Sequence, residues 1–135
     1  MGKRNDLRLG KPLEDRIPFS LGVVSSGRLL HTAGITARDR EGEIVGVGDV
    51  AAQTRQCFEN LGDILAAAGA SWADVVKYTI YTTDIQLFKD QTRELRAQYY
   101  VNRPAATLVE VSRLADPKMM VEIEAIVSLP EEGAT

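Results

Sequence analysis

The last third of the chain alternates apolar and polar residues with the period of two that predicts β-strands. Two segments carry this pattern, residues 107–112 and residues 119–127. Successive side chains of a strand point to opposite faces of its sheet, so the second segment places Glu122 and Glu124 on one face. A carboxylate is costly to bury without a partner, and these two interrupt an apolar segment. We therefore expect any chemistry of this chain to involve this strand.

Two earlier segments have apolar residues at the helical spacing of three and four. Asp49 is placed to cap a helix from Val50 to about residue 68, and Asp84 is placed to cap a second helix that ends near Tyr100. The apolar stripe of the first helix comprises Thr54, Cys57, Phe58, Leu61, Ile64, Leu65 and Ala68. That of the second comprises Phe88, Thr92, Leu95 and Tyr99. Each helix thus has a single apolar stripe, which predicts packing on one surface.

Three further segments have local signals of strands or turns. Residues 75–83 are rich in β-branched and aromatic side chains and predict a strand. Residues 17–35 predict a β-hairpin with Gly27 in its turn. A turn at residues 40–43 and a short strand at residues 44–45 complete the expected elements.

This order of elements predicts an α+β domain in which one sheet carries both helices on one face. We divide the chain into an N-terminal arm at residues 1–16, a domain at residues 17–130 and a C-terminal tail at residues 131–135. The strand segments have apolar residues on both faces. The sheet face without helices therefore predicts self-association.

Composition narrows the class of protein. A chain of 135 residues suits one domain, and a net charge of −3 lacks the basic footprint of a nucleic-acid binder. The chain has one cysteine and one histidine, so we expect neither an internal disulfide nor a metal site of the usual spacing. The sequence has no apolar run long enough to span a membrane and no signal peptide, which predicts a cytoplasmic protein.

Five stretches are typical of a known family and come in its order: PFSLGV at 18–23, TAGI at 32–35, GDVAAQTRQCFENLGDILAAAGAS at 48–71, DVVKYTIYTTDIQLF at 74–88 and RPAATLVEVSRLADPKMMVEIEAIV at 103–127. With them the chain resembles the Rid/YjgF family of reactive intermediate deaminases, which older naming calls the L-PSP endoribonuclease or translation-inhibitor family. The stretches span about four fifths of the chain, more than chance would give.

The resemblance implies a chorismate-mutase-like fold and a homotrimer whose sheets enclose a central β-barrel. It also implies small-molecule clefts between the subunits. A deaminating member of the family hydrolyses an enamine or imine, such as 2-aminoacrylate, to a 2-keto acid and ammonia. Neither a metal nor an organic cofactor takes part in that reaction.

This sequence departs from the family pattern where the cleft is expected. Deaminating members have an arginine after Pro-Ala that binds the substrate carboxylate with two donors, and Ala106 stands at that position here. Losing such a contact in a buried setting costs roughly 2 to 5 kcal/mol of binding. The other departures, which replace polar family residues, fall on Phe19, Leu21, Ala33, Ile35 and Thr92. The resemblance therefore implies a ligand other than the usual one.

Two matching positions remain. Glu122 matches the glutamate that holds the attacking water, and Gly34 matches a main-chain contact to the ligand. A carboxylate can orient water, accept its proton as it adds to a C=N carbon, and return a proton to the leaving amine. We therefore expect a Rid-family protein that hydrolyses an enamine or imine different from 2-aminoacrylate, with Glu122 as its catalytic residue.

Four side chains are candidates to replace the missing arginine: His31, Arg93, Arg96 and Arg103. Each also has a simpler interpretation, as a histidine hydrogen-bonded within the sheet or as a solvated surface arginine. Glu122 could likewise serve packing or a subunit contact. Two other functions stay open, a non-catalytic ligand-binding trimer or sensor and an endoribonuclease, although the net charge does not favour the latter.

Overall fold

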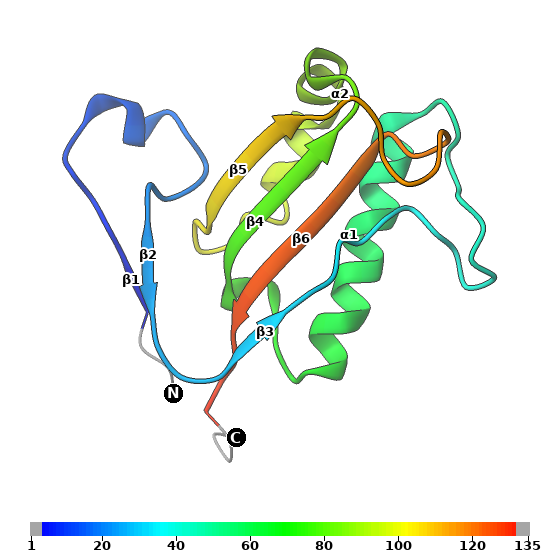
Figure 1. Cartoon of the computed structure of the whole chain (residues 1–135). Coiled ribbons are helices and arrows are strands. Elements are labelled where there is room, and N and C mark those ends of the chain that lie inside the picture. Colours follow the sequence, from blue (N-terminus) through cyan, green and yellow to red (C-terminus); the bar gives the residue numbers. More distant parts are fainter. Residues whose placement is uncertain (1–3, 132–135) are drawn as a thin grey trace.

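A mixed four-stranded sheet with two helices on one face forms the body of the molecule (Figure 1). The structure, a computed structural model, describes residues 4–131. The strand order is β3-β6-β4-β5, in which β4 and β5 are parallel and the other pairs are antiparallel. The strands are β3 Leu29–His31, β4 Val75–Thr82, β5 Ala105–Glu110 and β6 Val121–Ser128. The α+β fold predicted from the sequence is confirmed.

The two helices begin at the predicted caps. Helix α1, Val50–Ala67, starts where the Asp49 carboxylate accepts a hydrogen bond from the Ala52 N–H at 3.0 Å. Helix α2, Ile85–Ala97, starts where the Asp84 carboxylate accepts from the Leu87 N–H at 3.0 Å. Helix α2 ends before the predicted limit because the chain must turn sharply into β5, through left-handed residues at 102 and 103.

The N-terminal part of the chain differs from the predicted hairpin. Strand β2, Val23–Ser25, pairs with β1, Arg4–Asp6, and not with β3, which pairs with β6. A 3₁₀ turn, η1, Pro12–Asp15, lies between β1 and β2. The hairpin prediction was wrong because a turn signal is local, whereas strand partners are chosen by contacts distant in sequence. The turn at 40–43 is present, but the expected strand at 44–45 is a single bridge between Arg38 and Ile44.

Residues 4–28, which we call the N-terminal lobe, lie beside the β5 edge of the sheet (Figure 1). The Ser20 N–H donates to the Pro104 carbonyl at 3.0 Å, just before β5 begins. At the other end of the lobe, the Arg4 guanidinium donates to the carbonyls of Ala73 at 3.0 Å and Val75 at 2.8 Å. These contacts fix the lobe against the body.

The core lies between the helices and one face of the sheet. Tyr78 and Ile80 of β4 and Ile123 of β6 are fully buried there, together with Phe58 of α1 and Phe88 of α2. The other face of the sheet carries no helix and mixes polar and apolar side chains: Lys77, Thr79, Tyr81, Glu122, Glu124 and Ile126 from the two central strands, beside Ala105, Thr107 and Val109 of β5 and Leu29 and His31 of β3. Val75 and Val76 are both buried, because a register shift between Val75 and Lys77 alters the alternation at the start of β4.

No helix within residues 4–131 is both long enough and apolar enough to cross a membrane.

Candidate functional site

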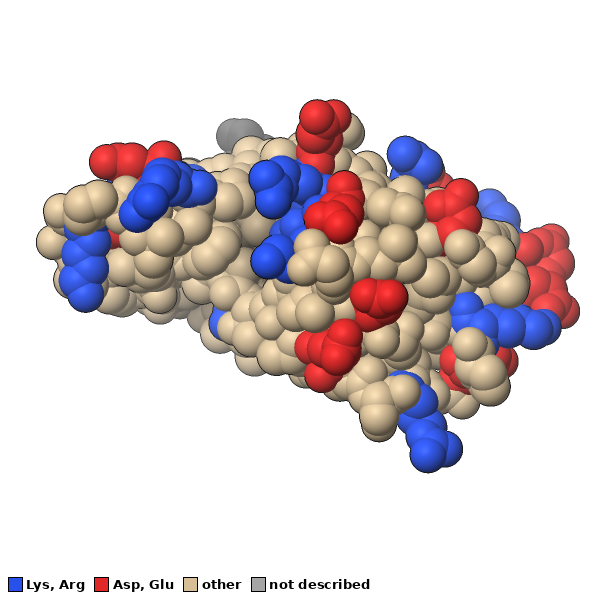
Figure 2. All heavy atoms as spheres, turned by 90° about the horizontal axis from the view of Figure 1, so that it is seen from above, with Lys and Arg blue, Asp and Glu red and all other residues tan. Residues whose placement is uncertain are grey.

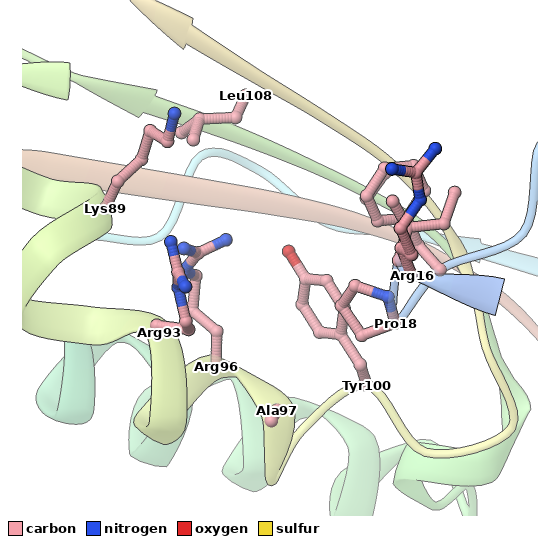
Figure 3. A pocket seen from close by; sticks show the side chains of 11 residues that line it. Arg16, Pro18, Lys89, Arg93, Arg96, Ala97, Tyr100 and Leu108 are labelled. Carbon is pink, nitrogen blue, oxygen red and sulfur yellow. The ribbon is translucent and has the colours of Figure 1, made fainter. Parts of the chain in front are cut away.

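A cavity of about 490 Å³ lies between α2, β5 and the N-terminal lobe (Figure 3). Its lining residues are Arg16, Ile17, Pro18, Phe19, Lys89, Arg93, Arg96, Ala97, Tyr100, Ala106 and Leu108. We call this cavity the basic pocket, because four of these side chains are cations and none is a carboxylate. An anion is the ligand that such a lining favours.

Helix α2 supplies three of the cations from one of its faces. Lys89, Arg93 and Arg96 follow one another at helical spacings of four and three, so they share one side of the helix. The Arg96 Nε donates to the Thr92 hydroxyl at 3.0 Å, and its guanidinium carbon lies 5.1 Å from the centre of the Phe88 ring. Figure 3 shows Arg93 and Arg96 side by side, with their guanidinium groups directed into the cavity.

These cations have no acidic partner among residues 4–131. Within that part of the chain, no carboxylate forms a salt bridge with Arg16, Lys89, Arg93 or Arg96. Bringing like charges together on one helix face destabilises the helix. A bound anion would relieve that repulsion.

Tyr100 adds a neutral hydrogen-bonding group to the basic pocket. Its hydroxyl points into the cavity in Figure 3. Burial raises the pKa of Tyr100 because the phenolate is poorly solvated there, and the nearby Arg96 opposes this rise. The hydroxyl therefore keeps its proton at neutral pH and can donate to a ligand.

Glu122 lies on the other face of the sheet. In the strand register, Glu122 of β6 is opposite Tyr81 of β4, whereas Ala106 of β5 is opposite Tyr78 of β4. Tyr78 and Tyr81 are three residues apart in one strand, so their side chains point to opposite faces. One chain thus holds Glu122 and the basic pocket on two sides of the same sheet.

Gly34 is in close contact with Glu122. Hydrogen bonds of 2.8 and 3.0 Å between the backbones of Ile35 and Ile123 hold the segment that contains Gly34 against β6. A Cβ at residue 34 would lie 1.9 Å from the Glu122 Oε2 atom. Glycine is needed here for space, and it lets the carboxylate lie directly against the main chain.

The Glu122 carboxylate is available for a ligand, whereas its neighbour on the strand is already engaged. The Tyr81 hydroxyl donates to the Glu124 carboxylate at 2.9 Å, and this bond raises the pKa of Tyr81. Among residues 4–131, no group donates a hydrogen bond to Glu122. Half-buried and unpartnered, Glu122 can accept a hydrogen bond from water.

The residues predicted from the sequence lie in several separate places. Phe19, Arg93, Arg96 and Ala106 line the basic pocket, and Ala33 and Gly34 are exposed on the segment beside Glu122. His31 is exposed and lines a separate, smaller cavity on the open sheet face with Lys77 and Glu124. Of the two departures at positions 19 and 21, only Phe19 lines the basic pocket, because Leu21 is exposed and does not line it.

Two predicted residues support the basic pocket from behind. Thr92 is fully buried; its hydroxyl donates to the Phe88 carbonyl at 2.6 Å and accepts from Arg96. The Arg103 guanidinium donates to the carbonyls of Glu14, Ile17 and Phe19 at 2.9 to 3.0 Å. Thr92 therefore orients Arg96, and Arg103 ties the N-terminal lobe to the start of β5.

Three charged or polar lining residues were missed from the sequence: Arg16, Lys89 and Tyr100. Lys89 could have been found, because it precedes Arg93 by four residues on a predicted helix. Arg16 has no such signal, since its place depends on how the lobe packs. Tyr100 was placed only at the end of the second predicted helix, and its ring is buried while its hydroxyl faces the cavity.

Other candidate chemistry in the described chain is limited. Cys57 is fully buried on α1, and burial raises the pKa of its thiol to about 12, so it is an inert core residue as predicted. In residues 4–131 no three His, Cys, Asp or Glu side chains converge on a possible metal site. The face seen in Figure 2 mixes basic and acidic side chains and has no continuous basic stripe of the kind that nucleic acids require.

Comparison with known proteins gives consistent matches. The profile of the family described as Endoribonuclease L-PSP matches residues 11–129. A RutC family protein of Pyrococcus horikoshii is 45% identical over 112 residues, which are 81% of this chain and 85% of that protein. The 2-iminobutanoate/2-iminopropanoate deaminase of Escherichia coli is 34% identical over 113 residues, with coverage of 81% and 85%. A Rid protein of unknown function from Yersinia pestis superposes with a TM-score of 0.83 at 34% identity, covering 93% of this chain and 98% of that one.

Proposed function

This chain belongs to the Endoribonuclease L-PSP family, also called the Rid/YjgF family, and on that premise we propose that it hydrolyses the C=N bond of a small imine. The imine can also form from its enamine tautomer. Water adds to the carbon, the C–N bond breaks, and a carbonyl compound and ammonia leave. The named activity of the Escherichia coli relative supports this reaction class.

The position of Glu122 carries the proposal. Its carboxylate has no hydrogen-bond donor among residues 4–131 and lies against Gly34, so it can hold a water molecule. It accepts a proton as the water oxygen attacks the imine carbon. The departing nitrogen then takes up a proton and leaves as ammonia while the new C–O bond becomes a carbonyl.

We propose that the complete site forms between the subunits of a homotrimer. Glu122 and the basic pocket lie on opposite faces of one sheet, so a single chain cannot apply both to one small ligand. A neighbouring subunit that covers the open sheet face would supply Glu122 to the basic pocket of the next. The ligand anion is held there by Arg93 and Arg96 in place of the arginine that Ala106 replaces.

The test is ammonia release from 2-iminopropanoate and from larger imines, each generated in situ by an amino-acid oxidase, with Glu122→Gln compared with the unaltered protein on every imine that the unaltered protein hydrolyses. Removing a general base costs on the order of 100-fold or more in rate. The matched control is Glu124→Gln on the same strand face, whose amide oxygen still accepts from Tyr81 and whose rate we expect within about threefold. Equal rates for a folded Glu122→Gln variant would refute a catalytic role.

A melting-temperature measurement, combined with the ammonia assay, tests the alternative of a non-catalytic binding protein. In that case, a stable product such as 2-oxobutanoate would raise the melting temperature of the protein, since a ligand stabilises the state that binds it. Ammonia release would meanwhile stay at the background rate for every imine tested.

A further inference from the structure

The number of cations in the basic pocket exceeds what one carboxylate needs. A carboxylate is satisfied by the two parallel donors of one guanidinium group. Here Arg16, Lys89, Arg93 and Arg96 line one cavity, and no carboxylate among residues 4–131 forms a salt bridge with any of them. A ligand with a single negative charge would leave most of this positive charge uncompensated.

These cations come from different sides of the cavity. Arg93 and Arg96 project together from α2, and Figure 3 shows Arg16 of the N-terminal lobe across the cavity from them. Lys89 lies one helical turn before Arg93, next to Leu108 of β5 in the same view. Two anionic groups joined by a short chain could therefore meet cations at two separate places.

The cavity also suits a ligand longer than a three-carbon acid. Its volume is about 490 Å³, and pockets from about 300 to 1,000 Å³ hold ligands of drug size. Phe19, Ala106 and Leu108 give it an apolar wall between the charged groups. Methylene groups that connect two carboxylates would pack against such a wall.

We propose that the ligand of the basic pocket is a dianion, namely the imine or enamine of a dicarboxylic 2-oxo acid, with the α2 cations Lys89, Arg93 and Arg96 binding one carboxylate and Arg16, across the cavity, binding the other. The inference rests on the proposed function for the reaction, which is the same hydrolysis to a carbonyl compound and ammonia. It adds the substrate class. Contacts to the second carboxylate are then the main source of binding free energy, in place of the arginine contact that Ala106 cannot make.

Binding is tested by calorimetry with stable 2-oxo acids. We expect 2-oxoglutarate to bind with a Kd at least tenfold lower than that of pyruvate or 2-oxobutanoate. Arg16→Gln and Arg93→Gln, which alter exposed side chains, should each weaken 2-oxoglutarate binding at least fivefold. The two variants should differ from each other in their effect on pyruvate binding. Arg55→Gln, an exposed position on α1 outside the pocket, is the matched control and should bind like the unaltered protein.

Inorganic phosphate is the probe for a general anion site. Phosphate binding as tight as that of 2-oxoglutarate would overturn the proposal, because the pocket would then recognise charge without the connecting chain. Equal Kd values for pyruvate and 2-oxoglutarate would overturn it as well.

An activity measurement distinguishes failure of this inference from failure of the proposed function. Ammonia release is compared for 2-iminoglutarate and 2-iminopropanoate, each generated in situ. We expect at least a tenfold higher kcat/KM for 2-iminoglutarate, reduced by Arg16→Gln. Equal kcat/KM values that still depend on Glu122 would refute the dianionic substrate alone. Selective 2-oxoglutarate binding without ammonia release from either imine would refute the reaction and leave the ligand class supported.

Discussion

At residue 34, the absence of a side chain decides where the Glu122 carboxylate can lie. A Cβ there would come within 1.9 Å of Oε2 and 3.1 Å of Cγ of Glu122. The backbone of Gly34 is not left-handed, so alanine introduces crowding without backbone strain. The flexible end of Glu122 is then the part that moves.

We therefore expect Gly34→Ala to fold normally and to lose activity. Its free energy of unfolding should fall by about 1 kcal/mol or less, because only a side-chain end must shift. Ammonia release should fall by at least tenfold, since the water-holding carboxylate is displaced. The control is Gly22→Ala, where the new Cβ would meet a Leu7 methyl carbon at 3.3 Å. Full activity in Gly34→Ala would show that the position of Glu122 is not critical.

Among the elements, the N-terminal lobe matters most for the basic pocket. It contributes Arg16 and Phe19 to the lining, yet within residues 4–131 its own strands, β1 and β2, pair only with each other. Arg103 links the lobe to β5 through three carbonyls. Arg103 does not line the basic pocket itself, but the positions of the lining residues Arg16 and Phe19 depend on it.

Arg103→Met tests this link. Removing three charge-assisted hydrogen bonds while keeping much of the aliphatic stem should cost about 2 to 4 kcal/mol of unfolding free energy. Limited proteolysis should then cleave within residues 7–22, and 2-oxoglutarate binding should weaken although no pocket side chain has changed. Urea unfolding and calorimetry measure the two effects. Arg113→Met, at an exposed position in the β5–β6 connection, is the control. An Arg103→Met protein with unchanged stability would contradict the proposed tether.

At the scale of the whole molecule, the two faces of the sheet have different roles. One face packs on the helices and meets the basic pocket at its β5 edge, and the other presents Glu122 with no helix over it. If the site forms between subunits, each subunit supplies its basic pocket to the site shared with one neighbour and its Glu122 to the site shared with the other.

Mixed trimers can reveal that arrangement. We would unfold and refold Glu122→Gln together with an Arg93→Gln/Arg96→Gln double variant, each nearly inactive alone. A Glu122→Gln subunit keeps its pocket and the double variant keeps its Glu122, so random mixing restores about a quarter of the sites. Ammonia release should recover to a similar fraction of the unaltered rate. Mixed trimers seen by native mass spectrometry but without recovered activity would show that both groups act from the same subunit.

What the sequence could predict was set by local interactions. Asp49 and Asp84 cap the helices that follow them, and the alternation around Glu122 fixes which residues of β6 share a face. Such patterns depend on neighbours within a few residues, so they survive any tertiary arrangement. The β1–β2 and β3–β6 pairings could not be predicted in this way, because the turn signal at Gly27 does not decide with which strand each segment pairs.

The sequence by itself therefore determined the helices, the two faces of β6 and the chemical type of the catalytic candidate, Glu122. Only the tertiary structure decided that Glu122 lies opposite to the basic pocket, that Arg103 is bound to carbonyls, and that Arg16 joins the α2 cations. The reason is physical. Side-chain direction follows from local backbone geometry, whereas a binding site needs groups brought together by the packing of segments far apart in the chain.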